Sequence, residues 1–511
     1  MTRQIPVLVA MLIALTACAV NPVTGKREIS IISESSEIEM GTQNYAPMQQ
    51  SEGGEYDIDP ALTEYVQGVG NKLAAVSDRD LPYEFVVLNN SVPNAWALPG
   101  GKIAINRGLL TELQSEAELA AVLGHEIVHA AAGHTANRME TGMLLQGLVL
   151  ATAVATSDSD YGNLAVGGAN VAGQLVSQKY GRDAELEADH YGMQYMSEAG
   201  YDPQGAVTLQ QTFVRLSEGQ KSNWLTGLFA SHPPSQARVE ANIAMAASLP
   251  PGGTTGADRY KAAMEETRKI APAYKAYDEG RAALADKNIE LASKKAEEAI
   301  RIFPGEGHFY ALRGDARIAN EQYKEAVTSF DEAIERRDDF FYYYLKRGLL
   351  YEELGDDDLA VRDLQKSLNY LPTAPAHLGL GRIAAEHGDR AAAIEHFKVV
   401  AGGQGPAADA ARASLVRLDL AENPSAYLLK RCDAGSNGEL VVSVKNNTTV
   451  SIGDVRLAIQ FRDEAGVPRR VDRRIGGRIA AGQVVSVRTG LGPFTAGGAC
   501  PVEIIGARIA D

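Results

Sequence analysis

A glycine recurs through the middle of this 511-residue chain at an almost constant spacing, and that repeat restricts the fold more than any other feature of the sequence. The steps between successive glycines are 34, 34 and 33 residues, and an alanine stands twelve residues after each one. The glycines are Gly280, Gly314, Gly348 and Gly381, and the alanines are Ala292, Ala326, Ala360 and Ala393. Small residues at fixed positions let paired helices pack closely, and stacked pairs bury faces that a single pair leaves exposed. The pattern predicts an α-solenoid over residues 257–422.

The period resembles that of tetratricopeptide (TPR) repeats, which implies a surface for a partner. Proline follows twenty-four residues after two of the glycines, at Pro304 and Pro372, where a repeat of this kind ends. Solenoids of this type commonly present a concave face to a peptide or protein. We therefore expect a protein-docking surface here, with a purely structural spacer as the alternative.

The repeats are expected to be one of several domains, because a chain of this length exceeds what one hydrophobic core accommodates. The run Pro-Pro-Gly-Gly-Thr-Thr-Gly at 250–256 suits neither helix nor strand, so it predicts a linker after a first domain at 18–249. Residues 423–511 hold short runs rich in β-branched residues between Asn, Asp and Gly, which predicts a small antiparallel β-sandwich. The expected fold class is multidomain α+β.

The N-terminus has the pattern of an export signal. Arg3 precedes an almost wholly apolar run at 5–17, which is short for a membrane span. The run ends in Leu-Thr-Ala before Cys18, and this resembles the recognition site of the lipoprotein signal peptidase. We expect a signal peptide at 1–17 and lipidation of Cys18, with an ordinary signal peptide and a chance cysteine as the alternative. By resemblance to the sorting rules of enteric bacteria, Ala19 rather than Asp after the cysteine favours the outer membrane of a Gram-negative bacterium, with the chain in the periplasm.

Export also bears on the two remaining cysteines. Cys432 and Cys500 both lie in the predicted β-sandwich. In an oxidising compartment a pair of cysteines within one small domain readily forms a disulfide. We expect that bond, with two buried free thiols as the alternative.

A metal-binding pattern lies in the first domain, on a predicted helix that begins after Ser115. Ser115 and Glu118 form a capping box, and apolar residues then recur at helical spacing. His125 and His129 are four residues apart, so their imidazoles project from one face and can bind a single ion. Glu126 stands beside them, where a carboxylate can polarise a water molecule. The pattern predicts a zinc centre, and a helix with two ordinary histidines is the alternative.

A catalytic zinc also needs a third protein ligand. A histidine six residues after His129 supplies it in one known arrangement, but that position is Thr135. A glutamate from a second helix supplies it in another, and here Glu185 and Asp189 share one helical face whereas Glu187 points elsewhere. We expect Glu185 to complete the site.

These motifs together resemble those of the peptidase family that includes HtpX and the CAAX prenyl proteases. The His-Glu-x-x-His motif is followed some fifty residues later by Glu-x-Glu-Ala-Asp, and the likeness continues through Asn21-Pro-Val-Thr-Gly-Lys-Arg, Asn94-Ala-Trp-Ala-Leu-Pro-Gly-Gly and Ser231-His-Pro-Pro. With the TPR repeats it points to the exported bacterial branch, the beta-barrel assembly-enhancing proteases. It implies a mainly helical, zincin-type metallopeptidase domain that binds one Zn²⁺ through His125, His129 and Glu185, with Glu126 as general base. The predicted β-sandwich does not belong to that pattern.

The resemblance suggests roles for three further residues. Asp189 matches a position usually assigned as proton donor, although a carboxylate there can equally orient a ligand histidine. Arg182, one turn before Glu185, can pair with these acids or with a substrate carbonyl, and a structural salt bridge stays open. His232 precedes two prolines, and three roles stay open for it. It is a fourth zinc ligand that keeps the enzyme latent, or an oxyanion stabiliser, or an exposed loop histidine.

The substrate is expected to bind as an added strand. Residues 83–88 read as a strand, and residues 94–105 as an approach and hairpin around Pro99-Gly-Gly. Family likeness places the substrate edge near Asn94 and Ala95, where backbone pairing gives affinity with little sequence preference. A purely structural hairpin is the alternative.

Two uncharged stretches, 141–157 and 161–178, separate the two metal-binding segments. They are 17 and 18 residues long, at or below spanning length, and rich in Gly, Ala, Ser and Thr. We expect a helical hairpin that covers the active site or touches the membrane surface, with true membrane insertion as the alternative.

Together these patterns predict a lipid-anchored periplasmic zinc metalloendopeptidase. By resemblance its substrates are envelope proteins, above all misfolded or stalled outer-membrane proteins, and its TPR surface docks to them or to envelope assembly machinery. The formal net charge of −16 and the pI near 5.2 argue against nucleic acid as a partner, because phosphate binding needs a basic face. The alternative is a periplasmic TPR chaperone or adaptor whose metal site is vestigial or rarely used.

Overall fold

The computed structural model describes residues 18–29, 32–138, 180–219, 231–462, 467–492, 494 and 500–510. These residues belong to two compact units, Met1–Pro372 and Thr373–Asp511. The expected signal peptide and the two uncharged stretches at 141–157 and 161–178 lie outside the described residues. Among the helices that are described, none is both long and apolar enough to cross a bilayer.

A small three-stranded sheet forms one side of the metal-binding part of the first unit. Its order is β3-β5-β4, in which β3 (Glu84–Leu88) is parallel to β5 (Lys102–Asn106), and β4 (Ala95–Leu98) is antiparallel to β5. The short turn Pro99–Gly101 joins β4 to β5, and Gly100 has a φ of 74°, which favours glycine. The predicted strand and hairpin are therefore present.

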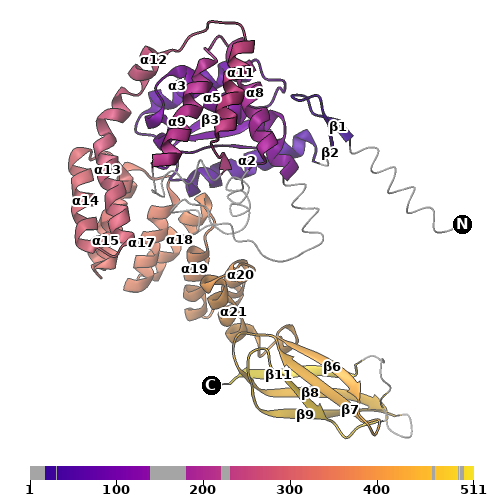
Figure 1. Cartoon of the computed structure of the whole chain (residues 1–511). Coiled ribbons are helices and arrows are strands. Elements are labelled where there is room, and N and C mark those ends of the chain that lie inside the picture. Colours follow the sequence, from indigo (N-terminus) through magenta and orange to yellow (C-terminus); the bar gives the residue numbers. More distant parts are fainter. Residues whose placement is uncertain are drawn as a thin grey trace, which may run out of the picture. The chain divides into compact units, whose positions relative to one another are not determined.

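Helices surround this sheet (Figure 1), and they carry most of the residues of the core. They are α2 (Glu34–Ser51), α3 (Pro60–Ala74), α4 (Arg107–Glu112), α5 (Glu116–Ala131), α8 (Arg182–Glu198), α9 (Gln204–Gly219) and α11 (Gln236–Ser248). One hydrophobic cluster joins residues of α3, α5, α8 and α9 to the sheet. Since α5 is buried along its whole length, it is the central element of this part of the molecule.

A short hairpin precedes these helices. It pairs β1 (Cys18–Val20) with β2 (Arg27–Ile29), and the turn between them contacts the metal-binding helices. The Asn21 side-chain amide donates to the Ala132 carbonyl at 2.9 Å, and Lys26 forms an ion pair with Glu187. The Asn21–Arg27 motif noted in the sequence therefore contacts the C-terminal end of α5 and the second turn of α8.

The glycine repeat forms paired helices, as predicted. The first unit contains α12 (Ala257–Ala263), α13 (Glu265–Ala285), α14 (Ile289–Ile302), α15 (Gly307–Ala319), α16 (Tyr323–Arg336), α17 (Phe341–Leu354) and α18 (Asp357–Tyr370). A Cβ atom added at Gly314 would lie 2.7 Å from the Phe330 ring, and one at Gly348 would lie 2.9 Å from Leu364. The alanines twelve residues on are fully buried. Glycine is thus required where the first helix of each pair meets a large side chain of the second.

The predicted linker is packed against the metal-binding part rather than free. Thr254 N–H donates to the Gly200 carbonyl at 2.9 Å, Ala117 N–H donates to Thr255 at 3.0 Å, and the Tyr260 hydroxyl donates to Leu110. The first compact unit accordingly runs through to Pro372 and includes the first three helix pairs. The boundaries at 18–249, 257–422 and 423–511 stay predictions.

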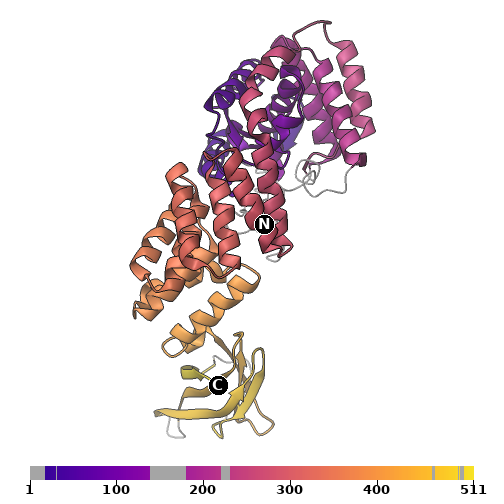
Figure 2. The ribbon, with the colours of Figure 1, turned by 90° about the vertical axis from the view of Figure 1, so that its left-hand side faces the viewer.

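The second unit holds the last helices and the β-domain (Figure 2). The helices are α19 (Ala374–Glu386), α20 (Arg390–Ala401) and α21 (Pro406–Asp419). The strands are β6 (Leu428–Ala434), β7 (Leu440–Asn446), β8 (Ile452–Arg462), β9 (Pro468–Ile479), β10 (Val484–Arg488) and β11 (Val502–Ile509).

The six strands form two antiparallel sheets of order β10-β7-β6 and β11-β8-β9. Residues of both sheets, such as Val442 and Leu457, share one hydrophobic cluster, so the domain is a sandwich, as predicted. A disulfide joins Cys432 to Cys500.

Candidate metal centre

Two histidines of the site stand on one face of α5. The Ser115 side chain accepts a hydrogen bond from Glu118 N–H at 3.1 Å, while the Glu118 carboxylate accepts one from Gln114 N–H at 2.7 Å, so the helix begins as predicted. One turn apart, His125 and His129 are both buried, and their Nε2 atoms lie 3.0 Å from each other. The helix therefore presents two nitrogens to a single point.

Helix α8 brings the third donor, and two glycines allow it to come close. A Cβ atom at Gly192 would lie 3.0 Å from the backbone nitrogen of His125, and one at Gly124 would lie 3.1 Å from the Gly192 carbonyl oxygen. Since the two backbones touch at this crossing, Glu185 Oε1 comes within 3.4 Å of His129 Nε2. The carboxylate reaches the histidines because no side chain separates the helices.

His232 is the fourth group at this point. It precedes α11, whose N-cap is Ser235, and it is only 5% exposed, so the reading as an exposed loop histidine is wrong. Its Nδ1 lies 2.9 Å from Glu185 Oε1 and 3.2 Å from His125 Nε2. The two prolines after it keep this segment extended.

These four residues form the one cluster among the described residues that can hold a metal ion, and their donor atoms lie within 4.8 Å of one another. The closest donor pairs are 2.9 to 3.6 Å apart. With zinc–donor bonds of about 2.0–2.2 Å, tetrahedral donors lie about 3.3 Å apart, so the arrangement fits one zinc ion. Three imidazoles and one carboxylate are also ligands that zinc prefers.

The protonation of the site suits a metal. Burial lowers the pKa of His129 well below its ordinary value, so its imidazole is neutral, as a ligand must be. Burial raises the pKa of Glu185, but the nearby His232 and His125 charges and hydrogen bonds outweigh it and lower the pKa overall, so this carboxylate stays ionised.

Glu126 lies beside the four donors without belonging to them. Its side chain is 2% exposed, Oε1 lies 3.6 Å from His232 Nε2, and Oε2 has no hydrogen-bond partner among the described residues. Burial raises the pKa of Glu126 above its ordinary value. A buried carboxylate with a free oxygen and a raised pKa can accept a proton from water and hold it.

Asp189 contacts His125, one of the four donor residues, but does not itself belong to the donor cluster. Its Oδ1 lies 2.9 Å from His125 Nδ1, on the side of the ring away from Nε2. Burial raises the pKa of Asp189, but the Arg238 charge and hydrogen bonds outweigh it and lower the pKa overall. A carboxylate that holds its charge so firmly is suited to orient His125 and poorly suited to donate a proton.

Arg238 makes the ion pairs that the sequence suggested for Arg182. Its Nε and Nη2 each lie 2.7 Å from an oxygen of Asp189, and its Nη1 lies 2.7 Å from Glu185 Oε2. Arg182 is exposed at the first residue of α8. Sequence reasoning missed Arg238, although its place in the helix that follows Ser231-His-Pro-Pro is the signal that could have singled it out.

Three more residues support the opposite side of the site. His134 Nδ1 lies 2.9 Å from His129 Nδ1, and the Tyr180 ring stacks on His129 with centroids 3.9 Å apart. Thr135, which occupies the position of a third histidine in the other zinc arrangement, has its Oγ1 2.9 Å from the Tyr180 hydroxyl. These contacts fix His129 on the side of the ring away from the donor cluster, and sequence reasoning did not predict them.

The predicted substrate edge borders this site. Ala95 begins β4, which pairs only with β5 among the described strands, and Asn94 immediately precedes it. Asn94 is 8% exposed, and its Oδ1 has no hydrogen-bond partner among the described residues. β4 is thus an edge strand of the sheet, but its residues are buried, and the Ala97 carbonyl accepts a hydrogen bond from Thr135.

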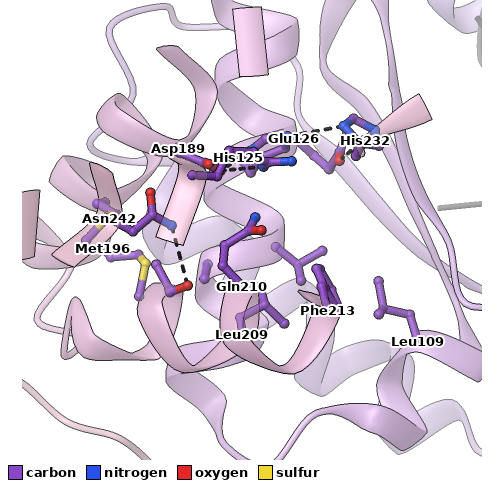
Figure 3. A pocket seen from close by; sticks show the side chains of 15 residues that line it. Leu109, His125, Glu126, Asp189, Met196, Leu209, Gln210, Phe213, His232 and Asn242 are labelled. Carbon is purple, nitrogen blue, oxygen red and sulfur yellow. Dashed lines mark hydrogen bonds and ion pairs between the residues drawn. The ribbon is translucent and has the colours of Figure 1, made fainter. Parts of the chain in front are cut away.

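A small pocket opens on the Glu126 side of the cluster (Figure 3). His125, Glu126 and His232 line one end of it, and Leu209 and Phe213 of α9 are among the apolar residues that line the rest. Its volume is about 40 Å³. A buried water needs roughly 10–15 Å³ of cavity volume, so the pocket has room for a few waters or a short side chain.

Comparison with known protein families matches two regions of the chain. Residues 60–245 match the family model described as "Peptidase family M48". Residues 277–339, 311–375 and 345–411 match the model described as "Tetratricopeptide repeat". The first match contains every residue of the donor cluster, and the second confirms the predicted repeats.

Individual relatives match part of the chain. The "Mitochondrial metalloendopeptidase OMA1" of Schizosaccharomyces pombe is 33% identical over 230 residues, which cover 43% of this chain and 63% of that protein. The "Beta-barrel assembly-enhancing protease" of Escherichia coli K12 is 27% identical over 224 residues, covering 43% and 45%. The "Metalloprotease YcaL" of Escherichia coli K12 is 28% identical over 205 residues, covering 40% and 73%.

The matched part thus spans less than two thirds of the first two relatives. The motif spacing, the donor cluster and the family match all concern residues 60–245. Residues 60–245 are thus similar to the metallopeptidases of family M48, and residues 277–411 are similar to tetratricopeptide repeats.

Proposed function

We propose that this chain is a zinc-dependent endopeptidase that cleaves unfolded or stalled proteins of the bacterial envelope. The observation that carries the proposal is the buried cluster of His125, His129, Glu185 and His232, with the free carboxylate oxygen of Glu126 beside it. Zinc held there would supply Lewis-acid polarisation of a peptide carbonyl and of water. Every other part of the reaction falls to the chain's own side chains.

Glu126 is the proton carrier of the proposed reaction. Its Oε2 accepts a proton from the attacking water, and its raised pKa lets it keep that proton until the amine leaves. Asp189 and Arg238 hold His125 in place through the 2.9 Å and 2.7 Å contacts, so the ligand face does not rotate. His134 and Tyr180 do the same for His129.

The substrate binds as an extended peptide along β4 in this proposal. Asn94 supplies a free side-chain acceptor, and Ala95 begins the edge strand β4. The small pocket beside Glu126 then receives a short side chain next to the cleaved bond. Backbone pairing with little side-chain selection suits proteins that are recognised because they are unfolded.

His232 restrains the enzyme in this proposal. A catalytic zinc keeps one position open for water, and three ligands are already present without His232. Because His232 Nδ1 lies within 3.2 Å of both Glu185 and His125, its ring occupies the place that water would need. Withdrawal of His232 would open the site.

The cellular setting rests on resemblance and on the N-terminal pattern. A relative of this domain is named for beta-barrel assembly, which agrees with a periplasmic role close to the outer membrane. Lipidation of Cys18 would tether the chain there, and the TPR repeats would dock substrates or assembly machinery.

The test of this function is a comparison between the wild type and Glu126→Gln. We expect both proteins to bind one zinc per chain, measured by elemental analysis. The wild type should degrade an unfolded model protein such as casein, whereas Glu126→Gln should not. Degradation by Glu126→Gln at the wild-type rate would reject the proposal, and full function of this variant in cells would favour the adaptor reading.

A further inference from the structure

The C-terminal β-domain differs in charge from the rest of the chain. Residues 428–511 contain twelve Lys and Arg against eight Asp and Glu, in a chain whose formal net charge is −16. Ten of the twelve cations are arginines. A guanidinium binds phosphate oxygens through two parallel hydrogen bonds, which an ammonium cannot do.

Five of these twelve cations lie on one face of one sheet. The outer face of the sheet β11-β8-β9 carries arginines at positions that are exposed and share its pleat: Arg456, Arg470, Arg474, Arg478 and Arg508. We call these five residues the arginine face. Arg462, at the end of β8, shares the outward side of the strand with Arg456.

The arginine face carries more positive charge than its acids neutralise. Arg470 pairs with Asp472 at 3.1 Å, while Arg474 and Arg508 share Asp454. Arg456 and Arg478 form no ion pair among the described residues. The third acid of this face is Glu503 on β11, opposite Ala458.

Two arginines of the face stand directly opposite each other. Arg456 on β8 is the cross-strand partner of Arg474 on β9. Like charges at such positions destabilise a sheet, so this pair costs stability unless an anion lies over it. Gly506 on β11 leaves the space that Arg456 occupies, since a Cβ there would lie 2.5 Å from the Arg456 guanidinium. The guanidinium is thereby held against the sheet.

We propose that the arginine face binds the phosphate groups of an anionic membrane surface. An open sheet face presents its charges in a single layer, which suits a flat array of headgroups. Clustered cations gain roughly 1 kcal/mol each near an anionic leaflet, enough together for reversible attachment. The acidic remainder of the chain is repelled by the same surface, so the β-domain is the part that meets the membrane.

Vesicle binding tests this surface directly. The protein is residues 18–511 with Cys18→Ser, which removes any acyl chain, and its binding is measured by co-sedimentation with phosphatidylcholine vesicles that contain or lack phosphatidylglycerol. We expect binding only to the anionic vesicles and its loss at high salt, where charges are screened. Equal binding to both vesicles, or to neither, overturns the proposal, and an acidic protein then becomes the partner to seek.

Matched variants locate the binding face. Changing Arg456, Arg474 and Arg478 to Gln should weaken binding roughly 100-fold, given about 1 kcal/mol per arginine. The control changes Arg431, Lys445 and Arg488 to Gln, the same loss of charge on exposed positions of the other sheet, and should stay within about twofold.

An equal loss in both triple variants overturns the assignment to this face. Should the first triple variant fail to fold, changing the same three residues to Lys keeps the charge. That protein must then retain most of the binding.

Discussion

At the scale of single residues, the site shows why a ligand needs a partner behind it. His125 and His129 are each held on the ring nitrogen that faces away from the donor cluster, by Asp189 and His134 respectively. Such contacts fix the tautomer and the ring orientation, so the second nitrogen is free for a metal. Zinc affinity should therefore depend on residues that never touch the ion.

Asp189→Asn tests whether this carboxylate orients His125 or donates a proton. We expect about 10- to 100-fold weaker zinc binding, the usual effect of removing such a partner, measured by competition with a chelator. Asp183→Asn, an exposed change on the same helix, is the control. Unchanged zinc affinity together with a fall in kcat would instead assign Asp189 the role of proton donor.

His232→Ala tests the proposed restraint. If His232 occupies the position that water needs, its removal should increase the rate of proteolysis while three ligands keep the zinc in place. The measurement is the initial rate of casein cleavage at saturating zinc. An oxyanion stabiliser would give a lower rate, and an unchanged rate would exclude both roles.

At the scale of elements, the site depends on how closely α5 and α8 cross. The sequence predicted both helices and their shared ligands, because residues four apart lie on one helical face. It did not predict the contact of Gly124 with Gly192, since nothing in the local pattern says which residues of two distant helices will meet. Arg238 was missed for the same reason: it reaches Asp189 from a third helix.

Gly192→Ala should push the two helices apart. The added Cβ would lie 3.0 Å from the backbone nitrogen of His125. We expect the free energy of unfolding to fall by about 1–3 kcal/mol, which is typical of overpacking, and zinc binding to weaken. Gly68→Ala in α3 is the control, because nothing lies within 4 Å of its new Cβ. Equal stability of the two variants would show that the crossing tolerates a side chain.

At the scale of the whole molecule, the repeats are predictable as a class and their attachment is not. The 34-residue period gives the helix pairs and even the buried Gly and Ala positions. The contacts between α15 and the metal-binding part involve single polar residues with no periodic signature. His308 Nε2 lies 2.9 Å from the Gly53 carbonyl oxygen, and the Asn89 amide donates to Glu306 at 2.7 Å.

This contact predicts a pH dependence of stability. Burial lowers the pKa of His308 to about 4, so the unfolded chain binds a proton near its ordinary pKa of 6.5 while the folded chain does not. Stability is therefore full above about pH 6.5 and falls as the pH drops towards 4, by up to about 3 kcal/mol from this group. The pKa of Glu306 is also lowered: burial opposes this, but the His308 charge and the hydrogen bonds from Tyr274 and Asn89 outweigh it, and the loss at low pH has the same sign.

Unfolding of the wild type and His308→Gln between pH 4 and 7 measures this effect. We expect the variant to lose less stability than the wild type over that range. His387→Gln, an exposed histidine of the second unit, should behave as the wild type. Parallel pH profiles for wild type and His308→Gln would contradict the assignment.

The most direct test of the account is whether Glu185 completes the metal centre. Elemental analysis and chelator competition should find one tightly bound zinc in the wild type. In Glu185→Gln, zinc affinity should fall by about 100-fold or more and proteolysis should be lost. Glu198→Gln, an exposed change on the same helix, should keep both. One zinc bound with unchanged affinity in Glu185→Gln would contradict the account.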